Sequence, residues 1–172
     1  MASRPNHIIV MPYLIDGHNL IGSGRVPGIN LQQEDDEYRL TQWLRARQPR
    51  LNQPVVVVFD SGSPGGWSRE LSGGGVSVVF AAQQRNRADQ VIFERVQQEM
   101  VRANYSVVTN DTVLREAMAS LGAKTMKVDE FMALVEKRPK RKRTVRAKRQ
   151  QTEPKLAKDE VDEWLKLFEE GE

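Results

Sequence analysis

The feature that most constrains the fold is VVVVFD at Val55–Asp60, where a run of apolar residues leads directly into a carboxylate. A continuous β-branched run is typical of a strand buried on both faces of a parallel sheet. Along the rest of the chain, similar apolar runs alternate with segments of helical periodicity. This alternation predicts a three-layer α/β/α domain with a mainly parallel central sheet.

The expected elements can be assigned by residue range. Loops are expected over residues 17–33 and in the Gly-rich stretch between Asp60 and Val76, and Pro49 is expected at the exit of the first helix. Helices are expected over 34–48, 88–103, 112–121 and 129–136, where apolar residues recur at helical spacing. Strands are expected at Ile8–Ile15, Val55–Phe59, Val76–Phe80, Tyr105–Thr109 and Ala123–Val128.

Charge and composition divide the chain into four parts. Residues 1–10 are predicted to be an N-terminal extension and residues 11–137 the folded domain. Residues 138–157 are expected to be a basic, disordered linker, since 137–149 contain nine Lys+Arg and no acid, and such a run can bind phosphates. Residues 158–172 are predicted to be a short acidic amphipathic helix. Its Trp164 and Phe168 either dock on a protein partner or pack back on the domain, and the sequence leaves both alternatives open.

The composition excludes several classes of site. The chain has no cysteine and only two histidines, which rules out disulfides, thiolate zinc sites and histidine-rich metal sites. A chain without cysteine is compatible with a reducing compartment, and we expect a cytoplasmic protein. No apolar run approaches the roughly 20 residues needed to span a bilayer, so no membrane partner is expected.

Four acidic residues stand at the ends of predicted elements. Asp16 and Asp60 each end a strand, Asp111 follows the end of a third, and Asp89 opens the helix that precedes that third strand. Asp89 and Asp111 have a simple local alternative as helix caps, and Asp60 has one as a turn residue. Because the carboxyl ends of parallel strands share one edge of a sheet, the four are expected to lie together. Crowded carboxylates favour a hard divalent cation, Mg²⁺ or Mn²⁺.

Four short motifs carry a resemblance to a known family. They are IDGHN at Ile15–Asn19, VVFD at Val57–Asp60, RAD at Arg87–Asp89 and VVTND at Val107–Asp111. In this order they resemble the NYN-domain nucleases, a branch of the PIN-like fold. The similarity is closest to the bacterial YacP-type proteins, some of which are ribosome-associated endoribonucleases. The resemblance covers roughly residues 11–137.

The resemblance implies roles for individual residues. Two positions depart from the family pattern: Gln90 replaces a second acid that often follows Asp89, and His18 replaces a common tyrosine. The implied catalytic residues are Asp16, Asp60, Asp89 and Asp111. The implied metal ligands are Asp16, Asp89, Asp111 and one acid of the first helix. The candidates for that acid are Glu34, Asp35, Asp36 and Glu37, of which Glu37 is favoured. The substrate contacts are expected from His18, Asn19, Arg85, Arg87 and Asn110.

The expected function is therefore a metal-dependent endoribonuclease that uses Mg²⁺ or Mn²⁺, acts on RNA and has the ribosome as a candidate place of action. One alternative is an RNA- or ribosome-binding adaptor with a weak catalytic site. The amide Gln90, in the place of an acid, is the reason to retain this alternative. Another is a receiver-like phosphoacceptor domain, since Asp60 and Thr109 end strands. The receiver alternative leaves Asp89 and the basic segment without a role.

Overall fold

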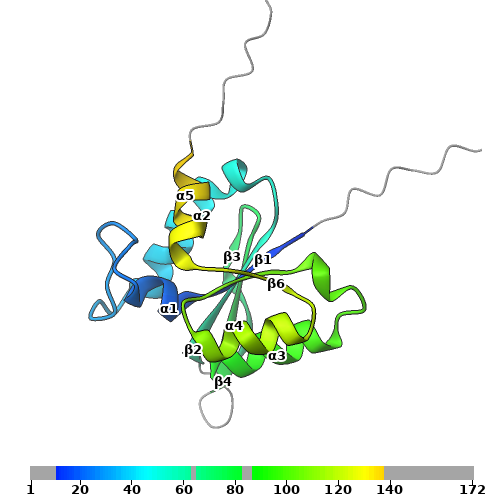
Figure 1. The fold of residues 1–172 in the computed structure, drawn as a ribbon. Helices are drawn as coiled ribbons and strands as arrows, with labels where there is room; N and C mark the ends of the chain where they lie inside the picture. Colours follow the sequence, from blue (N-terminus) through cyan, green and yellow to red (C-terminus); the bar gives the residue numbers. More distant parts are fainter. Residues whose placement is uncertain (1–10, 63–64, 83–86, 138–172) are drawn as a thin grey trace, which may run out of the picture. The chain divides into compact units, whose positions relative to one another are not determined.

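The valine run forms the strand β2, close to the middle of a six-stranded sheet with the order β3-β4-β2-β1-β5-β6 (Figure 1). The computed structural model describes residues 11–62, 65–82 and 87–137. All neighbouring strands are parallel except β3, which runs antiparallel to β4 at the sheet edge. The strands are β1 (Tyr13–Asp16), β2 (Val55–Gly62), β3 (Gly66–Gly73), β4 (Val76–Ala82), β5 (Ser106–Val108) and β6 (Lys124–Met126).

Helices cover both faces of this sheet, so the predicted three-layer α/β/α architecture is confirmed. Alternate residues of the central strands point to opposite faces: Val57 packs with the residues of α2 and α5, and Val56 with those of α3 and α4. The helices are α1 (Gly17–Gly22), α2 (Asp36–Leu51), α3 (Ala88–Gln98), α4 (Thr112–Ser120) and α5 (Val128–Glu136), with a 3-10 turn at Arg102–Asn104. None of the helices in the described part of the chain is long and apolar enough to cross a membrane.

The loop expected over residues 17–33 begins instead with the short helix α1. Asp16 caps this helix, since its Oδ1 accepts a hydrogen bond from the Asn19 backbone N–H at 3.1 Å. Leu20 and Ile21 are buried against the sheet and hold the helix down. Gly17 is required at its start, because a Cβ there would overlap the Phe59 ring.

The Gly-rich loop expected after Asp60 contains the edge strand β3. Its residues are mostly exposed and lack an apolar alternation, which is why the sequence pattern did not predict a strand. The signal for this hairpin is the turn itself: Gly74 and Gly75 both have positive φ, as a tight hairpin turn requires. The side chain of Arg45 in α2 donates to the carbonyls of Leu71 and Gly73 and so holds the hairpin against the helix.

Pro49 does not end its helix, contrary to expectation, and α2 continues to Leu51. The C-cap Asn52 adopts a left-handed conformation with φ 51°, and Leu51 is buried in the core. The other expected elements are present with shifted ends; α3, for example, ends at Gln98 rather than at Ala103. The predicted N-terminal extension, basic linker and C-terminal helix lie outside the described residues.

Candidate active site

The carboxyl edge of the sheet brings two of the other predicted aspartates, Asp60 and Asp89, close to Asp16. The parallel register pairs Asp16 with Val58, so Asp60 extends two residues beyond it on the neighbouring strand. Burial raises the pKa of Asp16 to about 6, and the negative charges of Asp60 and Asp89 contribute to the increase. The hydrogen bond from Asn19 and the nearby His18 oppose the increase without cancelling it. Asp16 is therefore a half-buried carboxylate in a crowded acidic environment.

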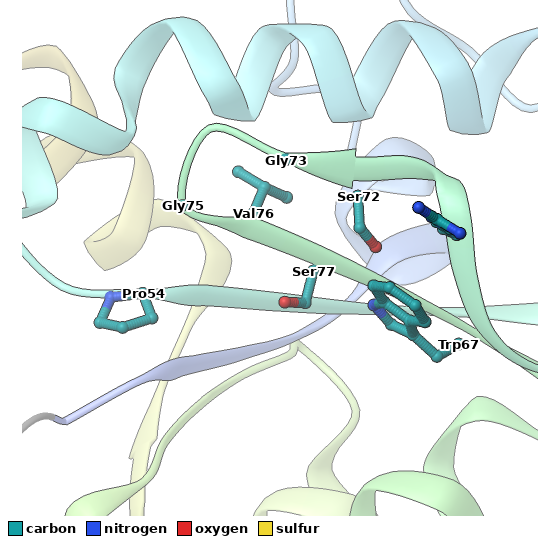
Figure 2. A pocket seen from close by; sticks show the side chains of 8 residues that line it. Pro54, Trp67, Ser72, Gly73, Gly75, Val76 and Ser77 are labelled. Carbon is teal, nitrogen blue, oxygen red and sulfur yellow. The ribbon is translucent and has the colours of Figure 1, made fainter.

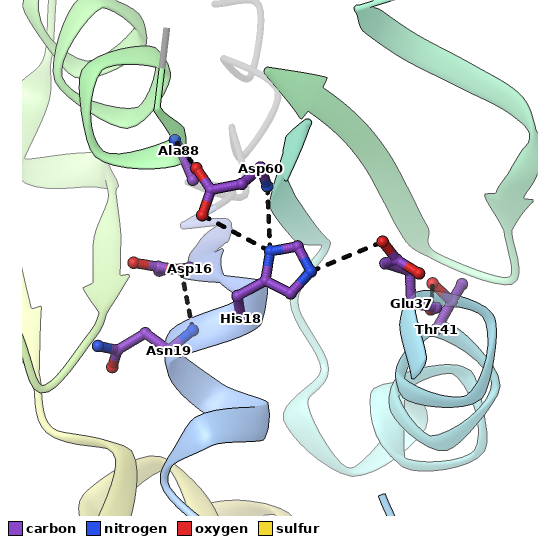
Figure 3. A network of polar contacts seen from close by, with 7 residues as sticks. All are labelled: Asp16, His18, Asn19, Glu37, Thr41, Asp60 and Ala88. Atoms are coloured by element: carbon purple, nitrogen blue, oxygen red, sulfur yellow. Dashed lines mark hydrogen bonds and ion pairs between the residues drawn. The ribbon is translucent and has the colours of Figure 1, made fainter. Parts of the chain in front are cut away.

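Asp60 connects this edge to the start of α3. Its Oδ1 accepts a hydrogen bond from the Ala88 backbone N–H at 2.7 Å, as Figure 3 shows. The N-cap residue Arg87 makes no side-chain cap of its own, so a carboxylate from a different strand satisfies the helix terminus. This bond fixes where α3 begins and hence where Asp89, in its first turn, lies.

His18 links Asp60 to the start of α2. Its Nδ1 accepts a hydrogen bond from the Asp60 backbone N–H at 3.2 Å, and its Nε2 lies 3.6 Å from Glu37 Oε1 (Figure 3). In a neutral ring this arrangement places the proton on Nε2, facing Glu37. The ring also packs edge-on against Phe59, with the centroids 5.3 Å apart.

Glu37 lies in a second acidic group, formed by His18, Asp36 and Glu37. One ligand atom from each lies within 4.8 Å of the others, which is compact enough for a single metal ion. Asp36 is only 5% exposed. Burial, and then the neighbouring Asp36 carboxyl, raise the pKa of Glu37 above its ordinary value. Asp36 was one of the four acids considered for the first helix, but its place in one group with Glu37 and His18 was not predicted.

Asn19 and Asn110 form hydrogen bonds that fix the loop after β5, on the other side of Asp16 from Asp60. The side chain of Asn19 accepts the Asn110 backbone N–H at 2.7 Å, and Asn110 Oδ1 accepts the Val128 N–H at 3.0 Å. These bonds tie α1, the loop after β5 and the start of α5 together. Both carboxamide oxygens are thus used in positioning the loop that contains Asp111.

Asp89 and Asp111 are the exposed members of the acidic set. Asp111 caps α4 through Oδ1, which accepts the Leu114 N–H at 2.9 Å, and this confirms its local alternative as a cap. Asp89 Oδ1 accepts only the N–H of Gln90. The second oxygen of each carboxylate forms no hydrogen bond within the described residues. Arg87 is exposed at the N-cap of α3, and Arg85 lies outside the part of the chain that the structure describes.

The donor set fits a divalent cation. Across residues 11–62, 65–82 and 87–137, no lysine or arginine forms an ion pair with Asp16, Asp60, Asp89 or Asp111. Burial is the main cause of the raised pKa of Asp16, and the charges of Asp60 and Asp89 add to the increase. Carboxylate oxygens are the ligands that Mg²⁺ and Mn²⁺ prefer, and an imidazole beside them extends the choice toward Mn²⁺.

Comparisons with known proteins agree with this arrangement. A family model described as YacP-like NYN domain matches residues 13–169. The crystal structure of Rae1 (YacP) from Bacillus subtilis is similar, with 25% sequence identity and a TM-score of 0.56, over 72% of this chain and 72% of that chain. A Trp-to-Leu variant of that protein gives 25% identity and a TM-score of 0.57, over 73% and 74% of the two chains. No curated protein matches the sequence.

Proposed function

The chain belongs to the YacP-like NYN domain family, whose fold is that of PIN-like nucleases, and on this basis we propose that it is a metal-dependent endoribonuclease. The observation that carries the proposal is the half-buried, uncompensated Asp16 surrounded by further carboxylates at one edge of the sheet. Such a group is costly unless a cation neutralises it. The substrate class that follows is RNA, and the reaction is hydrolysis of a phosphodiester bond.

The ion would be Mg²⁺ or Mn²⁺, held by Asp16, Asp89 and Asp111. When bound, such an ion lowers the pKa of a water molecule and stabilises the charge that develops on the phosphate. The acidic group of His18, Asp36 and Glu37 offers a further place for an ion.

The remaining residues of the edge position these ligands. Asp60 fixes the start of α3, and so places Asp89. Asn19 fixes the loop after β5, and so places Asp111. His18 holds Asp60 through its backbone, and in the neutral ring its Nε2–H faces Glu37. At neutral pH Asp16 is mostly ionised, as a cation ligand must be, because its pKa is only about 6.

Positive charge for the RNA backbone would come from Arg87, from Arg85 and from the basic run over 137–149. Phosphate contacts of this kind give affinity that falls with salt but carry no sequence information. We therefore propose that a larger partner selects the target. The ribosome is our candidate, the cytoplasm is the proposed location, and Trp164 and Phe168 are the proposed docking residues.

Cleavage of a mixed RNA pool with and without Mn²⁺ tests the proposal. We expect fragments from the wild type only when the ion is present, and none from Asp89→Asn. Asp129→Asn is the matched control, because that exposed aspartate pairs with Arg25 at 2.7 Å on another part of the surface. Cleavage that persists without divalent ions, or in Asp89→Asn, contradicts the proposed site.

The alternative function is a catalytically weak RNA- or ribosome-binding adaptor. The observation that favours it is Gln90, an exposed amide directly after Asp89 where an acid would add another ligand. The same assay separates the two functions. An adaptor binds the RNA through the basic run but leaves it intact with either ion, whereas a nuclease binds and cuts.

A further inference from the structure

A cavity of about 380 Å³ lies between α3 and α4, beside the acidic edge. Its walls include Asp89, Gln90 and Phe93 from α3, and Val113 and Ala117 from α4. The volume is at the lower end of cavities that hold small organic ligands. Of the described residues in the proposed mechanism, Asp89 and Asp111 line it, and the cavity extends from them along α3 and α4.

The cavity is continuous with the proposed metal site. Asp89 and Asp111 both line it. Both carboxylates are exposed, and the second oxygen of each forms no hydrogen bond within the described residues, so it can bind a cation. A phosphate held by that cation therefore has the cavity as its immediate neighbour. The part of the nucleotide that adjoins this phosphate must therefore lie either in the cavity or in open solvent.

The lining determines which part of a nucleotide it suits. Among the described residues, it contains two carboxylates and no lysine or arginine, so these residues repel a phosphate that lacks a metal ion. The half-buried Phe93, with Leu114 and Ala117, gives it an apolar wall, and Val113, 78% exposed, is also part of the lining. A flat, uncharged aromatic group with a polar edge matches these walls, and in RNA that group is the base.

Gln90 supplies a hydrogen-bonding group to this apolar cavity. One Nε2 hydrogen donates to Glu94 Oε1 at 3.1 Å, which holds the side chain along α3. The second Nε2 hydrogen and the Oε1 atom remain for a ligand. A side-chain amide that both donates and accepts can read the edge of a base. Gln90, which replaces an acid that often stands there in the family, can thus form hydrogen bonds with a base.

We propose that this cavity binds the base of the nucleotide next to the scissile phosphate, with Phe93 as the stacking surface and Gln90 as a specificity determinant. The identification of the phosphate as scissile rests on the proposed function. The binding of a base is independent of the proposed function, because it depends only on the cavity and its lining.

Photo-crosslinking tests the occupant without requiring cleavage. The full chain with Asp16→Asn is irradiated with a single-stranded RNA that contains 4-thiouridine, and trypsin then separates the two walls of the cavity. The α3 wall lies in residues 88–95, and Asp111, Val113 and Leu114 of the second wall lie in residues 103–115. The exposed Trp67 lies in residues 51–69 as an internal control. We expect crosslinks on the first two peptides, lost with Phe93→Leu and unchanged with Trp67→Ala.

Trp67 is a matched control because it lines a different hollow, over β3 and β4, together with Pro54 and Ser77 (Figure 2). Failure of the RNA to bind, or binding with crosslinks confined to other peptides, overturns the inference and leaves an apolar protein side chain as the better occupant. Crosslinks on both walls from a wild type that cuts no RNA support the base site and contradict only the proposed function.

Cleavage of an RNA with random sequence gives the second readout. We expect a base preference at one position beside the cut, flattened by Gln90→Leu, which keeps the size of the side chain but removes its hydrogen bonds. Phe93→Leu should lower kcat/KM about tenfold, since stacking on an aromatic ring contributes binding of this order. A base preference that is identical in Gln90→Leu and the wild type overturns the assignment of Gln90.

Discussion

The two halves of the acidic edge differ in how firmly their side chains are held. Around β1 and β2, Asp60 is bonded to Ala88 and to His18, and His18 faces Glu37. At the starts of α3 and α4, Asp89 and Asp111 are exposed, and within the described residues they form hydrogen bonds only to their own helices. The first half keeps a fixed geometry without a ligand, and the second leaves oxygen atoms free for one. A binding edge of this kind combines a rigid support with an open face.

The largest expected effect comes from Asp89→Asn, on the open half. We expect RNA cleavage to fall about a thousandfold, because the variant removes a charged ligand from the proposed ion. The free energy of unfolding should change by less than about 0.5 kcal/mol, since the residue is exposed and has no distant partner. Cleavage kinetics with Mn²⁺, paired with urea unfolding, measure the two effects.

The opposite pair of results would contradict this division of the edge. If Asp89→Asn lowers the free energy of unfolding strongly and still cuts RNA, the role of the open half is structural. The control is Asp129→Asn, which should change neither quantity.

Asp16, on the firmly held half, should make stability depend on pH. Its pKa is about 6 in the folded protein against 3.8 ordinarily, so the folded state holds the proton more tightly. The free energy of unfolding of the metal-free protein should fall as the pH rises from about 4 to about 6, by up to about 3 kcal/mol. Asp16→Asn removes the charge and should reduce this fall, leaving the part that the raised pKa of Glu37 contributes.

Urea unfolding of the metal-free protein at a series of pH values gives the measurement. Stability that rises over this range in the wild type, or a fall that persists unchanged in Asp16→Asn, would show that Asp16 is not the group responsible. Addition of Mn²⁺ at neutral pH should restore stability in the wild type but not in the variant, since binding to the folded state stabilises it.

Asp60 separates the structural role of a carboxylate from its charge. Asp60→Ala removes the acceptor for the Ala88 N–H and should lower the free energy of unfolding by about 1–2 kcal/mol. Asp60→Asn keeps an oxygen at the same place and should lower it much less. Equal losses in the two variants would mean that the negative charge, rather than the hydrogen bond, stabilises the start of α3.

The sequence predicted the central part of this arrangement because local patterns determine it. VVVVFD places Asp60 directly after the buried residues of a strand, although β2 continues to Gly62, and the parallel sheet then brings Asp16 alongside. The link from His18 to Glu37 could not be predicted, since it depends on how α1 packs beside α2. The short helix α1 was missed because two glycines border it, and its stability comes from a cap and two buried side chains.

The position of Gln90 gives the smallest and most selective test of the open half. Gln90→Glu supplies the acid that family members often have there, directly after Asp89. We expect the variant to bind Mn²⁺ a few-fold more tightly, because added negative charge near a cation site contributes about 1 kcal/mol at an exposed position. The titration compares Mn²⁺ binding by the wild type, Gln90→Glu and Gln90→Leu.

Unchanged affinity in Gln90→Glu would place the ion away from the start of α3. An equal gain in Gln90→Leu would show that the amide itself, rather than a missing charge, limits binding. The expected order, with a gain only for the acid, would locate the ion beside Asp89 and explain how an amide at this position weakens metal binding while leaving room for a base.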